Sequence, residues 1–356
     1  VVTVAVSVFM LSGRKISLMQ RSTMQDAISA PKVGGIVRLT KFILRGTFLI
    51  EALGAVLLFP VFCRDFGIKG IWMSVFHSIS AFCNAGFDIL GTTDHTFVSL
   101  TGYSRNIWLN IVIMLLIILG GIGFLTWEDF YTNKFKFKRY RMQSKVILIT
   151  TAILIIAPAV FFFACDFGNL PAGKRLLASV FQSVTTRTAG FNTEDLSLMT
   201  EAGKAVMILL MLIGGSPSST AGGMKTTTFA VLILNALATF RSREDAGAFG
   251  RRFDGQVVKN AATIAMMYFM LFFFGGITIS VYEGLPLLTC LYEAASAVGT
   301  VGLTLGITPE LHIISRLILI ALMYLGRVGG MTLIYAVFSR KNNNGAKMPL
   351  EKITVG

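Results

Sequence analysis

The sequence predicts an all-α membrane protein built from tandem units of about 100 residues, each with two long helices and one short helix. Hydrophobic residues make up 54% of the 356 residues and charged residues only 14%, which is too apolar for an ordinary globular domain. A second observation is a repeated pattern: a polar residue, a small or branched residue, glycine and a bulky apolar residue. Its three glycines, Gly86, Gly190 and Gly302, are 104 and 112 positions apart, which indicates an internal repeat.

Six apolar segments are long enough to cross a bilayer as helices, which takes roughly 20 residues. They are approximately residues 42–62, 107–127, 146–165, 205–240, 257–282 and 313–338. An opening apolar run at 1–11 is too short to span alone. We therefore expect a polytopic protein that lies in the lipid bilayer.

Basic residues gather in every second loop between these segments, although the net charge of the whole chain is +14. The basic loops lie at about 14–41, 134–145, 241–259 and 340–352. The positive-inside rule places such loops in the cytoplasm, which leaves the three glycine patterns on the outer side. In a soluble chain the positive charge would suggest nucleic acid. Its alternation with apolar segments favours membrane orientation instead, and no nucleic-acid partner.

A short apolar segment precedes each glycine pattern and is too short to cross the membrane. The three segments are 72–83, 174–187 and 287–299, and the patterns are Asn84, Ala85, Gly86 and Phe87; Thr188, Ala189, Gly190 and Phe191; and Thr300, Val301, Gly302 and Leu303. Non-helical backbone at membrane depth is tolerated only where it is buried in protein or lines a watery cavity. Loops repeated around an axis can turn their carbonyls toward a passing cation. A single such glycine would more simply mark a turn, but three in register favour a pore.

Each glycine pattern is followed, in the next apolar segment, by a glycine-rich stretch. The stretch after the second pattern differs from the other two. It consists of Gly214, Gly215, Ser216, Pro217, Ser218, Ser219, Thr220, Ala221, Gly222, Gly223, Met224 and Lys225. Ten of these twelve residues are Gly, Ser, Pro, Thr or Ala, so a regular helix is not expected there. The stretch predicts a break within the membrane that could act as a moving gate; the alternative is a static kink.

Two charged residues accompany these stretches, and charge within a membrane is costly enough to suggest function. Arg327 lies in the middle of the sixth apolar segment, where it could oppose a permeating cation and pair with loop carbonyls. Lys225 could simply mark where the broken helix meets the cytoplasm. For Glu51 and Arg45 we expect packing between helices or a position near an interface.

A membrane enzyme or scaffold, in which the glycines only pack helices, is the alternative from another functional class. It predicts catalytic groups at one depth, but the sequence has no paired intramembrane acids, no histidine-rich site and no nucleophile beside a base. The four cysteines form no C-x-x-C pair, and with three histidines there is no zinc-type cluster. We therefore expect no enzyme, no catalytic residue and no covalent cofactor.

Taken together, these residues resemble the Trk/Ktr/HKT superfamily of potassium-translocating subunits, in particular its KtrB branch, over essentially the whole chain. The segments that carry the resemblance are HSISAFCNAGFD at 77–88, TTRTAGFNT at 185–193, the stretch 214–228, GTVGL at 299–303 and GRVG at 326–329. The resemblance implies four helix–pore helix–helix (M1-P-M2) repeats around a pseudo-fourfold pore, with one filter glycine in each. It also implies that 214–225 is the intramembrane gate, with Arg327 beside it.

The resemblance further implies potassium as the substrate, bound only at backbone carbonyls of the filter, and sodium as a possible activator. It implies a homodimer on a KtrA-like cytosolic ring of nucleotide-binding regulatory subunits, in a bacterial-type plasma membrane. A sodium-preferring relative stays open as an alternative, because one filter position can change selectivity.

Only three patterns are present, and 1–11 resembles the end of a returning helix, so we expect an N-terminally truncated fragment whose first repeat is mostly missing. The expected divisions are 1–40 (the orphan end of the first repeat and a cytoplasmic linker), 41–140 (second repeat), 141–255 (third repeat with the intramembrane loop) and 256–356 (fourth repeat and tail).

Overall fold

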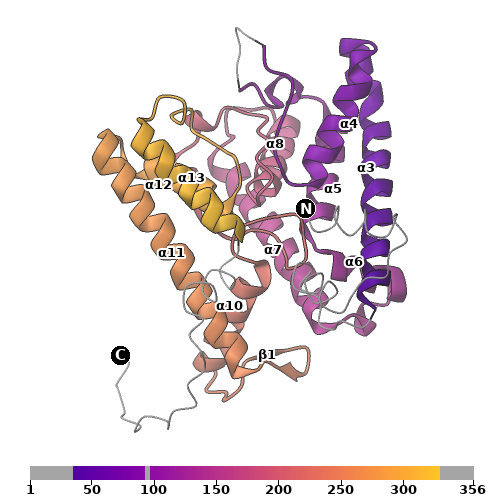
Figure 1. Ribbon diagram of the computed structural model, residues 1–356, viewed down its shortest axis with the longest axis vertical. Helices are drawn as coiled ribbons and strands as arrows, with labels where there is room; N and C mark the ends of the chain where they lie inside the picture. The colour runs from indigo at the N-terminus through magenta and orange to yellow at the C-terminus, as the bar shows by residue number, and fades with distance from the viewer. Residues whose placement is uncertain (1–34, 93–96, 329–356) are drawn as a thin grey trace.

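The computed structural model describes residues 35–92 and 97–328. Within these residues the regular secondary structure is almost entirely helical, and a long helix followed by a short helix occurs three times. Figure 1 shows α3, α4 and α5 at one side of the molecule and α11, α12 and α13 at the other, with α7 and α8 between them. The mostly helical membrane protein expected from the sequence is confirmed.

The first group of helices is tied together by close backbone approaches. It comprises α3 (Ile36–Phe66), α4 (Lys69–Phe82), η1 (Thr101–Tyr103), α5 (Ile107–Gly121), α6 (Phe124–Asn133) and η2 (Phe137–Arg139). A Cβ at Gly70 would lie 2.3 Å from Phe62 O, and one at Gly54 would lie 2.3 Å from Ser78 Oγ. Small residues at these two positions let α4 fold back closely along α3.

In the second group the expected last helix is divided into two shorter helices. It comprises α7 (Met142–Cys165), α8 (Ala172–Thr185), η3 (Leu196–Leu198), α9 (Glu201–Leu212) and α10 (Thr226–Phe240). Thr200 caps α9 by accepting a hydrogen bond from Gly203 N at 3.0 Å, which satisfies one of the unpaired donors of the first turn. Between α9 and α10 lies the glycine-rich stretch, and no helix forms there.

The third group begins after a small hairpin that the sequence did not predict. The elements are β1 (Gly247–Ala248), β2 (Arg251–Arg252), α11 (Gly255–Glu283), α12 (Leu287–Gly299) and α13 (Ile313–Val328). Phe249 and Gly250 both have positive φ, 53° and 72°, as a two-residue type I′ turn requires. Asn-Gly and Asp-Gly are the usual sequences of such turns, so the Phe-Gly sequence did not predict one. The all-α expectation is therefore wrong at this hairpin.

Three described helices, α3, α7 and α11, are each long and apolar enough to cross a membrane. The expected span at 107–127 is bent: α5 ends at Gly121 and α6 continues at 97° to it, and the two helices together are long and apolar enough to cross a membrane. The expected span at 205–240 is divided into α9 and α10. The opening run at 1–11 and the part of the sixth expected span after residue 328 lie outside the described residues.

Two hydrophobic clusters hold the short helices in place. One surrounds α4, α5 and α8 and includes Phe82 and Phe191; the other surrounds α9 and α12 and includes Met211 and Val301. The three glycine patterns lie where these clusters meet, since Phe191 belongs to one and Val301 to the other. The site described next is therefore supported by packed side chains on both sides.

Candidate functional site

The three glycine patterns form loops that lie against one another. Loops 1, 2 and 3 are residues 84–87, 188–191 and 300–303, and they follow the C-termini of α4, α8 and α12. A Cβ at Gly86 would lie 2.3 Å from Ala189 O, and one at Gly190 would lie 2.3 Å from Val301 O. Loop 2 is buried between the other two. The structure therefore brings together three segments that are far apart in the sequence.

All three loops share one unusual backbone conformation. The residues with positive φ are Asn84 (49°) and Gly86 (69°) in loop 1, Thr188 (70°) and Gly190 (88°) in loop 2, and Thr300 (51°) and Gly302 (93°) in loop 3. The residue between them has negative φ in every case. Such an alternation points successive peptide groups to the same side of the chain. Glycine adopts the positive φ without strain, whereas Asn and Thr do so at some cost.

The N–H groups of the loops turn back to the preceding short helix. Ala85 N donates to Ser80 O at 2.9 Å, Ala189 N to Thr185 O at 3.0 Å, and Val301 N to Ser296 O at 2.8 Å. By contrast, the carbonyls of the first three residues of each loop accept no hydrogen bond from any residue that the structure describes. Each loop thus presents unpaired carbonyl oxygens, which a cation or water could satisfy.

A hydroxyl side chain near the end of each short helix anchors its loop. Ser80 Oγ donates to Phe87 O at 2.8 Å, Thr185 Oγ1 donates to Phe191 O at 2.6 Å, and Ser296 Oγ accepts from Gly302 N at 3.2 Å. Sequence reasoning missed these residues. The signal was available, since each hydroxyl stands five or six positions before a loop glycine.

The stretch between α9 and α10, called the intramembrane segment (214–225), lies against the loops. Its Thr220 Oγ1 accepts a hydrogen bond from Asn84 Nδ2 at 2.9 Å. The same oxygen lies 3.0 Å from Phe82 O and 3.1 Å from Gly120 O and can donate to either. Thr220 therefore joins the intramembrane segment to loop 1, to the end of α4 and to α5.

The intramembrane segment also reaches loop 3 and α13. A Cβ at Gly222 would lie 1.9 Å from Thr300 Oγ1, so the segment passes directly beside the start of loop 3. Arg327 Nη1 donates to Thr220 O at 3.2 Å. The positive charge that the sequence singled out is thus bonded to the segment at the residue that also contacts loop 1.

The bend between α5 and α6 exists because the intramembrane segment occupies the space beside it. Gly123 has φ of 88°, and a Cβ there would lie 2.4 Å from Pro217 O. Phe124 N donates to Ser218 O at 2.8 Å instead of continuing the helix ladder. Gly123 makes room for Pro217 and Gly120 for Phe82 and Thr220, so these two glycines are more than packing residues within their own helix.

Lys225 is attached to the intramembrane segment by a hydrogen bond. It precedes the first turn of α10, and its Nζ donates to Ala221 O at 2.7 Å within the segment. The N–H of Thr226 donates to Gly215 O at 3.0 Å, and the Ser216 and Thr226 hydroxyls are 3.0 Å apart. These bonds attach the start of α10 to the segment.

The remaining residues expected at the site also lie in the intramembrane segment or in the three loops. Gly214 N donates to Met224 O at 2.8 Å, which closes the segment on itself, and a Cβ at Gly223 would lie 3.2 Å from the Cα of Gly214. Ser219 Oγ is buried and has no partner among the described residues. The apolar loop residues differ: Leu303 is buried, whereas the Phe87 side chain is 69% exposed.

A cavity of about 860 Å³ lies between loops 1 and 3. Asn84, Ala85, Val301 and Gly302 line it, and Arg327 stands at its edge. Among the described residues there is no group of three or more His, Cys, Asp or Glu side chains that could hold a metal ion. The site thus offers backbone oxygens, amide and hydroxyl groups, the Glu293 carboxylate and the guanidinium groups of Arg316 and Arg327.

Comparisons with known proteins agree with this geometry. A family model described as TrkH, cation transport protein, matches residues 1–345. The chain is 38% identical to the potassium/sodium uptake protein NtpJ of Enterococcus hirae, over 98% of this chain and 78% of that protein. It is 33% identical to the Ktr system potassium uptake protein B of Bacillus subtilis, over 99% of this chain and 79% of that protein. The crystal structure of the potassium transporter TrkH from Vibrio parahaemolyticus has the same fold, with a TM-score of 0.70 at 17% identity, covering 90% of this chain and 68% of that chain.

Proposed function

We infer that this chain, which belongs to the TrkH family of cation transport proteins, is the potassium-translocating subunit of a Ktr/Trk-type uptake system. The family expected from the sequence is confirmed, and the chain is therefore a membrane transporter and no enzyme. Its specific substrate, its gate and its partners are our proposals. The names of the relatives, which include potassium uptake proteins, support the choice of ion.

The observation that carries the proposal is the set of unpaired carbonyls in loops 1, 2 and 3. An unpaired peptide group at membrane depth costs several kcal/mol unless something satisfies it. A dehydrated potassium ion can do so, because carbonyl oxygens replace part of its hydration shell. The C-terminal ends of α4, α8 and α12 precede the loops and add partial negative charge there. We propose that the three loops form sides of a pseudo-fourfold selectivity filter.

We further propose that the intramembrane segment is the gate. It lies across loops 1 and 3 and is held by Thr220, and Arg327 adds a positive charge that repels a cation. Opening requires the Arg327–Thr220 and Asn84–Thr220 hydrogen bonds to break. A regulator can bring this about only if it binds the open and closed states with different affinity.

The regulator that we propose is a cytosolic ring of nucleotide-binding, KtrA-like subunits beneath a homodimer of this chain, with sodium as an activating ion. The name of the Bacillus subtilis relative, which assigns it to a Ktr system, supports a multisubunit assembly. We place the basic loops in the cytoplasm and the three loops toward the outside of a plasma membrane, on the evidence of the positive-inside rule.

A sodium-preferring transporter is the second candidate. The Enterococcus hirae relative is named a potassium/sodium uptake protein, and sodium also binds oxygen ligands. The two candidates share the filter and the gate and differ only in which ion the filter prefers.

The test is ion uptake at low external potassium by cells that lack other potassium uptake systems and express the transporter with its regulatory partner. Gly190→Ser introduces a side chain at φ of 88° and 2.3 Å from Val301 O, so potassium affinity or selectivity should fall by about tenfold or more. Gly168→Ser is the control, because Gly168 has open space around it and no positive φ. Sodium uptake without potassium uptake would select the second candidate, and transport of neither ion would contradict both.

A further inference from the structure

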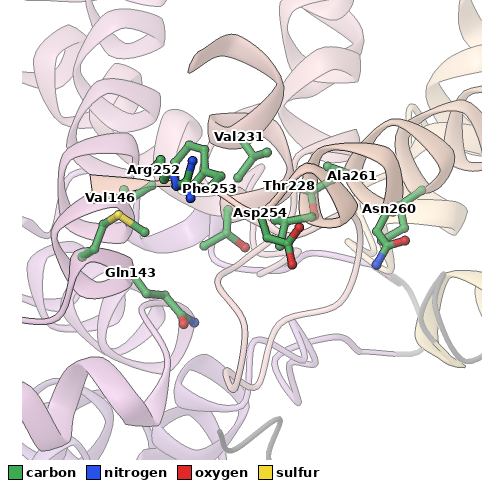
Figure 2. Close-up of a pocket in the computed structure, with 13 residues that line it drawn as sticks. Gln143, Val146, Thr228, Val231, Arg252, Phe253, Asp254, Asn260 and Ala261 are labelled. Carbon is green, nitrogen blue, oxygen red and sulfur yellow. The ribbon is translucent and has the colours of Figure 1, made fainter. Parts of the chain in front are cut away.

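A second pocket, distinct from the loops, opens at the end of the molecule that carries the hairpin. Its volume is about 420 Å³. The N-terminal parts of α7, α10 and α11, strand β2 and the residues that follow β2 form its walls (Figure 2). Figure 1 shows α10, the hairpin and this end of α11 close together, at the lower end of the view. The transport path proposed above does not use this pocket.

The pocket has an apolar floor and a polar rim. Val146, Val231 and Ala261 lie on its floor and are buried. Gln143 and Thr228 lie at the rim, and their side chains make no hydrogen bond with any described residue. A pocket with these two parts fits an amphipathic molecule better than a wholly polar one.

The segment that forms the rim carries more positive than negative charge, although the lining itself includes the Asp254 carboxylate as well as Arg252. Arg252 lines the pocket, and its side chain is 78% exposed although it is paired with Asp245 at 3.1 Å. Lys145 Nζ lies 5.6 Å from the ring centre of Phe249 at the tip of the hairpin. The surrounding segment 241–259 contains the five bases Arg241, Arg243, Arg251, Arg252 and Lys259 against the three acids Glu244, Asp245 and Asp254. An anionic group is therefore the complementary ligand.

The position of the pocket indicates that the other part of the ligand is an apolar chain. It lies at the beginning of α7 and α11, and both helices are long and apolar enough to cross a membrane. The helix ends are where lipid headgroups meet the protein, and exposed apolar side chains such as Ile149 on α7 and Met266 on α11 continue from this level. A ligand with a charged head at the rim and an apolar chain along the floor matches this position.

We propose that this pocket binds one anionic phospholipid. Its phosphate lies near Arg252 and within reach of Asn260, and the first part of an acyl chain covers Val146 and Val231. Basic pockets between membrane helices are suited to anionic headgroups, and each nearby Arg or Lys contributes to the attraction.

The bound lipid would also act on the gate, a consequence that rests on the proposed function. Thr228 lies in the first turn of α10, whose first residue, Thr226, is hydrogen-bonded to Gly215 and Ser216 in the intramembrane segment. A lipid that fills the space between α7, α10 and α11 therefore restrains the helix that leads out of the gate. Movement of α10 during opening changes the shape of the pocket, so lipid binding and gating are thermodynamically linked.

The experiment measures lipid binding directly, without transport. The purified transporter in detergent is titrated with phosphatidylglycerol or with phosphatidylcholine of the same acyl chains, and the bound lipids are counted by native mass spectrometry. Arg252→Gln should weaken phosphatidylglycerol binding about fivefold, since one basic residue near an anionic lipid contributes on the order of 1 kcal/mol. Arg243→Gln is the matched control, because Arg243 is in the same basic segment but does not line the pocket.

A second variant tests the shape of the pocket. Val257 lines the pocket and is 45% exposed, so Val257→Trp should fill the space without disturbing the core and should remove one bound lipid. Val281→Trp, at an exposed position near the other end of α11, should retain it. Equal binding of the two lipids, or no loss in Arg252→Gln and Val257→Trp, would overturn the proposal. Competition by soluble glycerol 3-phosphate at the lipid's own concentration would overturn it too, in favour of a free phosphate compound. Because no transport is measured, failure of the transport proposal would leave this result unaffected.

Discussion

The three loops have nearly the same backbone, whereas the chain segments that follow them in the three groups differ. The loops repeat positive φ at their first and third residues. After loop 1 the returning helix bends by 97° at Gly123, and after loop 2 it is interrupted by the intramembrane segment. After loop 3 the described part of the helix runs through Gly326 to Val328, and the counterpart of Gly123 lies outside the described residues.

The two outer returning helices nevertheless share one contact. A Cβ at Gly120 would lie 2.0 Å from Phe82 O, and one at Gly326 would lie 2.0 Å from Val298 O. Phe82 and Val298 each stand four positions before a loop glycine. In the middle copy, Gly214 faces Gly222 O of the intramembrane segment at 2.1 Å instead.

The roles that we propose for the two regions account for this difference. An ion on an axis needs equivalent oxygens from every side, so the loops are held to one conformation. The space beside the loops holds the intramembrane segment, our proposed gate, which comes from the second group of helices. The neighbouring repeats keep their glycines to accommodate it. Repetition in this chain therefore marks the region proposed to bind the ion, and departure from repetition marks the region proposed to gate it.

The largest effect is expected from a substitution that gives one loop a different backbone conformation from the other two. Gly86→Ala places a Cβ at φ of 69° and 2.3 Å from Ala189 O, so loop 1 must move away from loop 2. Potassium uptake should fall by about tenfold or more, because a left-handed non-glycine residue alone costs roughly 1–2 kcal/mol. Uptake assays with membrane quantities matched by immunoblot measure this.

The control for this variant is Gly102→Ala, since Gly102 lies in η1 with open space around it and no positive φ. Normal potassium affinity in Gly86→Ala would show that loop 1 does not contribute to the filter, and the equivalence of the loops would then be structural only.

Sequence reasoning located the repeated parts well because local chemistry determines them. The expected short helix at 287–299 matches α12, and the expected break at 214–225 matches the gap between α9 and α10. In both cases the signal is local: a small apolar run that ends in glycine, or a stretch without helix-forming residues. Whether these residues act as filter and gate stays a prediction.

The parts that sequence reasoning missed depend on contacts between distant segments. The bend at Gly123 follows from the position of Pro217, and the several bonds of Thr220 follow from where α4 and α5 end and where α13 places Arg327. A glycine or threonine in a single sequence carries no sign of such a partner. The hairpin was missed for another reason, since Phe-Gly is an uncommon sequence for a two-residue turn.

A smaller effect is expected from loosening the gate, the region where the repeats differ. Thr220→Val keeps the shape of the side chain but removes the hydroxyl that contacts Asn84, Phe82 and Gly120. The closed arrangement loses about 1 kcal/mol, so basal potassium flux without the regulator should rise about fivefold. Flux is measured in proteoliposomes that contain the transporter alone.

The matched control is Ser219→Ala, which removes the neighbouring hydroxyl that has no partner among the described residues. It should leave basal flux unchanged. An equal rise in both variants would indicate general loosening of the segment, and reduced flux in Thr220→Val would contradict the gate.

The smallest effect is expected from removing one of the hydroxyl groups that hold the three loops to their short helices. It tests whether the loops contribute equally to ion selectivity. Ser80 and Thr185 donate to the carbonyl after the loop glycine, whereas Ser296 accepts from the N–H of Gly302. Ser296→Ala leaves that N–H without this partner, at a cost of about 1 kcal/mol or less, so potassium over sodium selectivity should fall only two- to fivefold. Thr185→Val releases the Phe191 carbonyl instead of an N–H. If both variants lower selectivity, the anchors are equivalent in function despite their opposite hydrogen bonds. If only Ser296→Ala does, the position of the Gly302 peptide is the more sensitive, and the three loops are alike in backbone but unequal in their contribution to ion choice.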